Sequence, residues 1–232
     1  MSGAIVIWHD IAPEGLAEFY AWHGEEHMPE RVSIPGFQSG RRFIARAADL
    51  QYFNLYETDS MEVVNGVDYK ARLDSPTPRT LSAVRHFRNV ARSLCRVVTA
   101  PSAAASGTAQ GGLIATLRYD IDEAHEASHL EIFQREIIPA LTRSQGIARS
   151  SLLVADRAAS GYVNAEQRAR GAMNVVPPVV LIVESWADEG SFLKVLDVSL
   201  SNETLERCGL DGIANLGIYA HQLTIQKSGG LR

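Results

Sequence analysis

Hydrophobic positions in the first hundred residues change their spacing along the chain, from alternate residues to every third or fourth residue. Alternation is typical of strands, and the wider spacing is typical of helices. Pro29 has no amide hydrogen, so we expect the first helix to end near Met28. The expected strands are residues 3–10, 37–45, 51–57 and 94–98, and the expected helices are 14–28, a short one within 61–74, and 80–93.

When the sequence is shifted by 110 residues, its first part aligns with its second part without a gap. Pro29 then lies opposite Pro139, and Gly36 opposite Gly146. Such self-similarity indicates a divergent tandem repeat. The domains predicted from it are a first copy at 1–100, a small-residue polar linker at 101–112 and a second copy at 113–228.

The second copy repeats the order of elements found in the first. We expect its strands at 113–119, 150–155, 179–186 and 217–226, and its helices at 123–138 and 190–200. Each copy then follows the order β-α-β-β-α-β, so the predicted fold is α+β, with two tandem ferredoxin-like plaits. An insertion at 156–178 is either a functional flap or an idle loop.

The first helix carries ionisable side chains on the face that a helix normally buries. At 100° per residue, one stripe contains Leu16, Tyr20, His23, His27 and Arg31. The positions opposite the last four in the second copy are all apolar, namely Leu130, Phe133, Ile137 and Leu141. The second copy is therefore expected to pack an ordinary core where the first copy places two histidines and an arginine.

A single histidine on an apolar face is more often a core residue with satisfied hydrogen bonds than a functional group. Two histidines and an arginine together are harder to explain in this way, because burying each of them unpaired costs about 1–3 kcal/mol. The second copy manages with Phe, Ile and Leu, so the fold itself has no need of the ionisable groups. We therefore predict a functional pocket beside the first helix.

Composition narrows the classes of function. With 232 residues, 46% of them hydrophobic, the chain can fill two cores of about 100 residues each. A formal net charge of −5 gives no electrostatic reason to expect nucleic acid or an anionic membrane as a partner. No apolar run approaches the ~20 residues that cross a bilayer, and no signal-peptide pattern is present, so we expect a cytoplasmic protein. Cys95 and Cys208 are too few for a disulfide framework.

Several other patterns have an ordinary structural explanation. His23 and His27 fit the H-x-x-E-H spacing of inverted zinc proteases, but Gly24 weakens the helix and no third ligand is identifiable. His125 and His129 share this spacing near the start of their helix, where a surface pair is expected. A solvated face is expected for the arginines of the predicted helix 80–93 and its flank, Arg79, Arg85, Arg88 and Arg92.

The run His27-Met-Pro29, followed by Ile34-Pro-Gly-Phe37 and a strand from Arg41, resembles the H-x-P…P-G segment of the EthD-like branch of the dimeric α+β barrel superfamily. The resemblance implies two plaits paired sheet to sheet, here within one chain, with pockets between the helices and the sheets. Its members include cofactor-independent monooxygenases, lactone isomerases, polyketide dehydratases and cyclases, and haem-binding branches. It carries the motif histidine to His27 alone, and the second copy departs from the motif at Ile137.

The chemistry that the stripe permits is proton transfer. A neutral imidazole accepts a proton from an acidic carbon or a phenol, and a neighbouring arginine stabilises the resulting anion. We expect a cofactor-independent isomerase, dehydratase/lyase or oxygenase acting on a hydrophobic aromatic or carbonyl compound. His27 is the expected general base, His23 a shuttle or orienting residue, and Arg31 and Arg41 oxyanion partners. The expected substrate-binding residues are His9, Tyr20, Trp22, Arg41, Tyr52 and Tyr56.

Two alternatives belong to other classes of protein. One is a haem-binding or metal-binding barrel that uses His23 or His27 as a ligand, which an absorption spectrum and a metal analysis would detect. The other is a non-catalytic ligand-binding or assembly module with the stripe at a subunit contact. In the leading interpretation the partner is a small-molecule substrate without cofactor or metal, and the chain is a possible homodimer.

Overall fold

The computed structural model describes residues 2–98, 110–122, 124–210 and 214–227. Eight strands close into one barrel in the order β1-β3-β2-β8-β5-β7-β6-β4, and every neighbouring pair is antiparallel. The strands are β1 (Gly3–Ile11), β2 (Phe37–Ala47), β3 (Tyr52–Thr58), β4 (Phe87–Val98), β5 (Leu113–Tyr119), β6 (Ile147–Ala155), β7 (Val179–Ser185) and β8 (Asn215–Gln226). Because β2 pairs with β8 and β4 with β6, the two halves of the chain close the barrel on each other. An α+β fold with both halves in one barrel is therefore confirmed.

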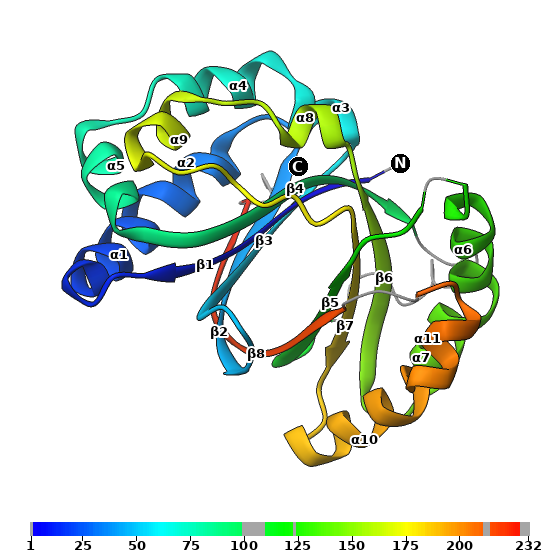
Figure 1. The fold of residues 1–232 in the computed structure, drawn as a ribbon. Helices are drawn as coiled ribbons and strands as arrows, with labels where there is room; N and C mark the ends of the chain where they lie inside the picture. Colours follow the sequence, from blue (N-terminus) through cyan, green and yellow to red (C-terminus); the bar gives the residue numbers. More distant parts are fainter. Residues whose placement is uncertain (1, 99–109, 123, 211–213, 228–232) are drawn as a thin grey trace, which may run out of the picture.

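Helices cover the outside of the barrel in two groups, one for each half of the chain (Figure 1). The first group is α1 (Leu16–Trp22), the π-helical turn η2 (His23–His27), α2 (Met28–Ser33), α3 (Met61–Asn65), α4 (Val67–Asp74) and α5 (Pro78–Ala83). The second group is α6 (Glu126–Ile132), the π-helical turn η5 (Phe133–Ile137), α7 (Ile138–Arg143), α10 (Glu189–Ser199) and α11 (Asn202–Arg207). Within the described ranges, no helix is both long and apolar enough to cross a membrane.

The inside of the barrel and its two outer faces hold separate hydrophobic cores. Trp8 and Phe53 stack inside the barrel with ring centroids 5.0 Å apart. The outer face of the second half buries Phe133 under its helices. On the outer face of the first half, Tyr52 and Tyr56 of β3 belong to two smaller clusters. Side chains thus alternate along β3, since its polar aromatic face lies under α1 and α2 and its dry face lines the barrel.

The first helix does not end near Met28 as predicted. It continues to Ser33 through η2, where the amide of Met28 donates to the carbonyl of His23, five residues earlier. Pro29 then lies in the first turn of α2, where a missing amide hydrogen costs little. The second half has the same break at the equivalent positions, in η5, and its helix continues to Arg143. Its predicted start at residue 123 lies outside the described residues.

The predicted helix 80–93 is wrong beyond its first turn. α5 ends at Ala83, a short 3-10 turn follows, and β4 begins at Phe87 rather than at residue 94. Asn89 takes a left-handed φ of 52°, after which the chain pairs continuously with β1. Pairing with β1 on one side and with Val175 of the insertion on the other satisfies the backbone in an extended form, which overrides the helical spacing of the side chains. Arg92 is consequently buried on β4 instead of lying on a solvated helix face.

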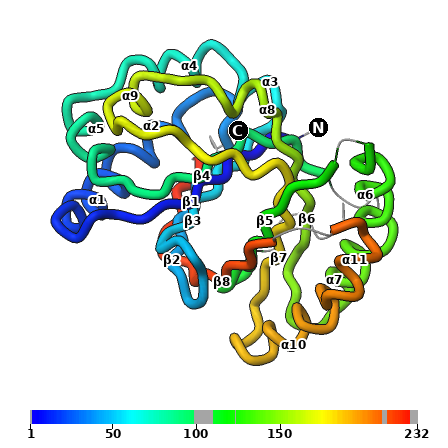
Figure 2. The backbone as a smooth tube through the Cα atoms, viewed as in Figure 1, coloured from blue at the N-terminus to red at the C-terminus, as the bar shows by residue number. Residues whose placement is uncertain are grey.

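The insertion at 156–178 crosses from the second half of the chain to the helices of the first half, as Figure 2 shows. We call these residues the flap. It contains α8 (Arg157–Ser160) and α9 (Ala165–Arg170), and α9 packs against α4 and α5. Both of its ends are held to β4, where the amide of Asp156 donates to Leu94 O at 2.8 Å and the amide of Arg92 donates to Val175 O at 2.8 Å. Of the predicted linker, residues 101–109 lie outside the described residues.

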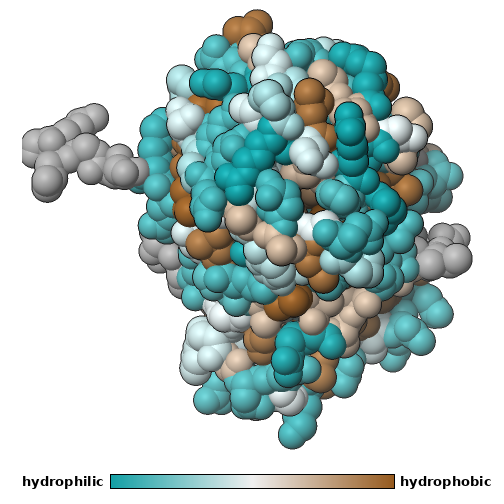
Figure 3. Space-filling view, turned by 90° about the vertical axis from the view of Figure 1, so that its left-hand side faces the viewer, coloured by the Kyte–Doolittle hydropathy of each residue, from teal (hydrophilic) through white to brown (hydrophobic). Residues whose placement is uncertain are grey.

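The outer face of the first-half helices mixes hydrophobic and hydrophilic residues, which Figure 3 shows interspersed rather than gathered in one patch. Tyr20 of α1 is 37% exposed. A large contiguous apolar patch would point to a protein interface. This face therefore gives no reason to expect that a second copy of the chain binds to it, and the homodimer stays a prediction.

Candidate functional site

The two histidines of the predicted stripe are both buried. His23 is 3% exposed and His27 is 9% exposed. They begin and end the π-helical turn η2, and their rings stack with centroids 5.6 Å apart. A π-helical turn disturbs the regular helix and recurs at functional sites. Both halves of this chain contain such a turn, but only the first half places ionisable side chains on its buried face.

A cavity of about 70 Å³ lies between this helix and the outer face of the first half's sheet. The flap lies over it, and residues from α9 form part of its wall. Four of the predicted site residues line the cavity, namely Trp22, His27, Arg31 and Tyr56. The space holds a few water molecules but is small for a ligand with an aromatic ring. A substrate of that size therefore requires the flap or the side chains beneath it to move.

His27 is held beside an aromatic ring and an arginine. The centroid of its imidazole is 4.3 Å from that of Trp22, whose Nε1 donates to Thr80 Oγ1 at 3.0 Å and so fixes the indole. Burial, followed by the charge of Arg31, holds the pKa of His27 well below its ordinary value. Its Nδ1 has no hydrogen-bond partner among the described residues. The ring is thus neutral and able to accept a proton.

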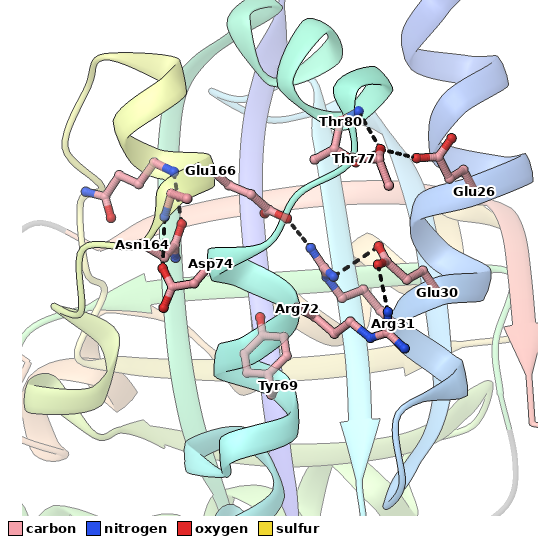
Figure 4. Close-up of polar contacts among 12 residues, drawn as sticks. Glu26, Glu30, Arg31, Tyr69, Arg72, Asp74, Thr77, Thr80, Asn164 and Glu166 are labelled. Atoms are coloured by element: carbon pink, nitrogen blue, oxygen red, sulfur yellow. Dashed lines mark hydrogen bonds and ion pairs between the residues drawn. The ribbon is translucent and has the colours of Figure 1, made fainter.

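Arg31 connects the first helix to the flap. It is 2% exposed, donates to Glu30 Oε2 at 3.2 Å, and forms an ion pair with Glu166 of α9. Figure 4 shows Glu166 reaching across to Arg31 from the flap, with Glu30 on the helix side of the same guanidinium. Burial is the largest single effect and lowers the pKa of Arg31, but the charge of Glu166 and the smaller effects of Tyr69, Glu30 and Tyr56 together outweigh it and raise the pKa overall. Arg31 therefore stays charged at the cavity wall.

Four of the other predicted residues, His9, Tyr20, His23 and Tyr52, form a neighbouring cluster that does not line the cavity. Tyr20 and Tyr52 share a hydrogen bond of 2.7 Å between their hydroxyls. Arg42 Nη1 lies 3.4 Å from His23 Nδ1, and its guanidinium lies over the ring of Tyr20. His9 packs against Tyr52 with ring centroids 5.4 Å apart, and burial lowers its pKa to about 3. The stacked rings of His23 and His27 join this cluster to the cavity.

The structure does not bring Arg41 to the site. Its guanidinium forms two hydrogen bonds to Glu184, at 2.7 and 2.9 Å, and is 1% exposed. Successive residues of a strand point to opposite faces, so Arg42 faces the helix while Arg41 faces the barrel interior. The proposed oxyanion role of Arg41 lacks the contact with His27 that it would need.

Sequence reasoning missed the polar residues that complete the cavity wall. They come from α4, β4 and the flap, and include Tyr69, Arg92, Asn164, Glu166, Gln167 and Arg170. Arg92 is 7% exposed and donates to the hydroxyl of Tyr69 at 3.0 Å. The one sequence signal for these residues was the insertion at 156–178. Its position over the first half depends on the tertiary fold, which the spacing of residues along the sequence does not encode.

The second half fills the equivalent space with side chains. Phe133, Ile137 and Leu141 are buried in its core, and Leu130 packs against them. The expected surface pair is wrong in part, because His129 is 1% exposed and bonds to Tyr119 Oη at 2.8 Å and to Cys208 O at 2.8 Å. The imidazole of His129 is fully satisfied, as a structural histidine should be. The imidazole of His27 is not.

Without movement of the flap, the cavity beside His27 is too small for a haem. The described residues contain no group of three or more His, Cys, Asp or Glu side chains placed to hold a metal. The space that the described residues leave beside His27 is the cavity of about 70 Å³, bounded by Trp22 and the flap. A porphyrin requires a pocket several times larger. The arrangement instead offers a neutral base, a buried cation and an aromatic wall.

No protein-family model and no curated protein sequence matches the chain. Solved structures match it over almost its whole length. An anthrone oxidase-like protein is 14% identical with a TM-score of 0.59, covering 99% of this chain and 94% of that one. A Fusobacterium nucleatum protein assigned provisionally as a monooxygenase is 10% identical with a TM-score of 0.59, covering 98% and 95%. An Arg-to-Ala variant of chlorite dismutase from Candidatus Nitrospira defluvii is 8% identical with a TM-score of 0.52, covering 94% and 91%. Likeness at such identities shows the fold alone, which is that of a dimeric α+β barrel.

Proposed function

We propose that the chain is a small-molecule enzyme of the EthD type, built from two tandem ferredoxin-like plaits, in which His27 transfers a proton. The observation that carries the proposal is the asymmetry between the halves. At equivalent positions the first half buries His27 and Arg31 beside a cavity, while the second half buries Ile137 and Leu141 in a packed core. Burying ionisable groups costs free energy that the second half shows to be avoidable.

The chemistry begins with a substrate that enters beneath the flap and lies against Trp22 and Tyr56. Neutral His27 removes a proton from an acidic carbon or a phenol of this substrate. The negative charge that develops is stabilised by Arg31, which is buried and stays charged. Trp22 fixes the imidazole by packing against it. The closed flap excludes water from the pair formed by the substrate anion and Arg31.

Proton removal is the common first step of the three reactions that the site can support. Return of the proton at another carbon gives an isomerase, loss of a leaving group gives a dehydratase or lyase, and attack of the anion on O₂ gives an oxygenase. The anthrone oxidase-like and provisionally assigned monooxygenase neighbours favour the oxygenase. Measuring O₂ consumption during turnover with an oxygen electrode distinguishes it from the other two.

The test is to identify a bound compound and follow its acidic proton. Native mass spectrometry of the purified protein reveals a co-purified molecule, and NMR in D₂O then measures the exchange of its acidic hydrogens. We expect wild-type protein to accelerate the exchange and the His27→Ile variant to lose most of the acceleration. Equal exchange rates for the two proteins would show that His27 is not the base.

A further inference from the structure

The cavity beside His27 contains more positive than negative charge. Arg31, Arg92 and Arg170 line it, and Glu166 is the single carboxylate among the lining residues. Glu30 adds a second carboxylate through its contact with Arg31. Both carboxylates are therefore engaged with Arg31, and neither forms an ion pair with Arg92 or Arg170 among the described residues. Glu30 also lies 3.6 Å from the guanidinium of Arg72, so at least one positive charge more than the neighbouring carboxylates can balance remains beside the cavity.

Arg92 and Arg170 also keep unused hydrogen-bond donors. Arg92 Nη1 and Arg170 Nε are shielded from solvent and have no hydrogen-bond partner within the described ranges. The hydroxyl of Tyr56, on the same cavity wall, is unpaired in the same way. Leaving a buried donor unsatisfied is costly, more so for a charged group. Such a set of donors in one cavity indicates a ligand that accepts hydrogen bonds.

The positive charges of Arg92 and Arg170 repel each other. Burial, followed by the charge of Arg92, lowers the pKa of Arg170. Arg92 sits on β4, and Arg170 ends α9 in the flap, so the two guanidinium groups come from opposite sides of the cavity. An anion between them would relieve the repulsion and would satisfy both donors. It would also hold the flap closed over the site.

We propose that the substrate of this site is an organic carboxylate, whose carboxyl group is bound by Arg92 and Arg170 while its hydrophobic part extends toward Trp22 and His27. A carboxylate fits better than a phosphate because most of the wall is apolar and Glu166 already contributes a negative charge to it. A planar guanidinium also matches a carboxylate with two parallel hydrogen bonds. The assignment rests on the proposed function for the orientation toward His27, and it names the substrate class of that enzyme.

The test compares benzoate with benzamide, which has the same shape but no charge, by isothermal titration calorimetry at pH 7.5. We expect benzoate to bind at least about tenfold more tightly. The Arg170→Gln variant should weaken benzoate binding by about tenfold or more, as expected for losing a charged hydrogen bond. Arg168→Gln is the matched control, because Arg168 lies on the same helix but is exposed and does not line the cavity. Arg92→Gln should repeat the effect of Arg170→Gln if its melting temperature shows that it folds.

Equal binding of benzoate and benzamide would overturn the assignment, as would equal weakening in Arg170→Gln and Arg168→Gln. His27→Ile separates this inference from the proposed function. The variant should still bind benzoate within a few-fold of wild type, because Arg92 and Arg170 remain in place. If benzoate binding depends on Arg170 while proton exchange does not depend on His27, the carboxylate site stands and the proposed catalytic role fails.

Discussion

The buried histidines of the first half should make the stability of the fold depend on pH. Burial is the largest cause that lowers the pKa of His9, to about 3, and the pKa values of His23 and His27 well below 6.5. In the unfolded chain all three imidazoles titrate near 6.5. Below pH 6.5 the unfolded state therefore binds more protons than the folded state, and the free energy of unfolding falls as the pH falls.

The size of the effect follows from proton linkage. Between pH 7.5 and pH 5.5, one histidine that protonates only on unfolding lowers the free energy of unfolding by about 1.4 kcal/mol, so three lower it by about 4 kcal/mol. Other groups also titrate in this range, so a substitution of His27 is needed to isolate the contribution of that one histidine. The loss over the same interval should consequently be smaller in the His27→Ile variant than in wild type, by the contribution of one histidine.

The assay is urea denaturation followed by circular dichroism at the two pH values. His125→Gln is the control, because His125 is exposed and its variant should follow the wild type. If His27→Ile and wild type lose the same free energy between pH 7.5 and pH 5.5, folding does not lower the pKa of His27. That result would contradict the buried, neutral imidazole on which the account of the site rests.

Three further substitutions test the surroundings of the site. Glu166→Gln removes one partner of a buried ion pair and should lower the free energy of unfolding by about 3 kcal/mol in urea denaturation, and an unchanged value would show that the flap does not hold Arg31. Ile137→His should destabilise by about 1–3 kcal/mol and leave turnover unchanged, whereas new activity would contradict the assignment of the second half as non-catalytic. Gly36→Ala should lower the melting temperature, because Gly36 has a φ of 87° and a Cβ there would collide with Val63.

The sequence predicts the fold well because both signals that define it are local or repeated. The β-rich runs of the sequence form the strands, and the two halves have the same helical break at equivalent positions, in η2 and η5. The expectation that the helix ends before Pro29 is wrong, because the π-helical turn changes the hydrogen-bonding register before this proline. Helical spacing failed beyond Ala83, because pairing with β1 and with Val175 of the flap outweighs it.

The candidate site was predictable only on the side that one helix contributes. The stripe placed His27 and Arg31 at the cavity wall, and the second half served as the comparison. Glu166 is 135 positions away from Arg31 in the sequence, so no spacing argument connects them. Arg92 was assigned to a solvated helix face, and its burial follows from the strand and the flap that cover it. Contacts of this kind belong to the tertiary fold.

The central claim is that His27 serves chemistry rather than the fold, and one paired measurement on His27→Ile tests it most directly. At pH 7.5 the melting temperature should equal or exceed that of wild type, because isoleucine has a similar size and removes a costly polar burial. The turnover of the compound identified by native mass spectrometry should fall about 100-fold or more, the usual cost of losing a general base. A variant that unfolds, or one that folds and keeps wild-type turnover, would contradict the claim.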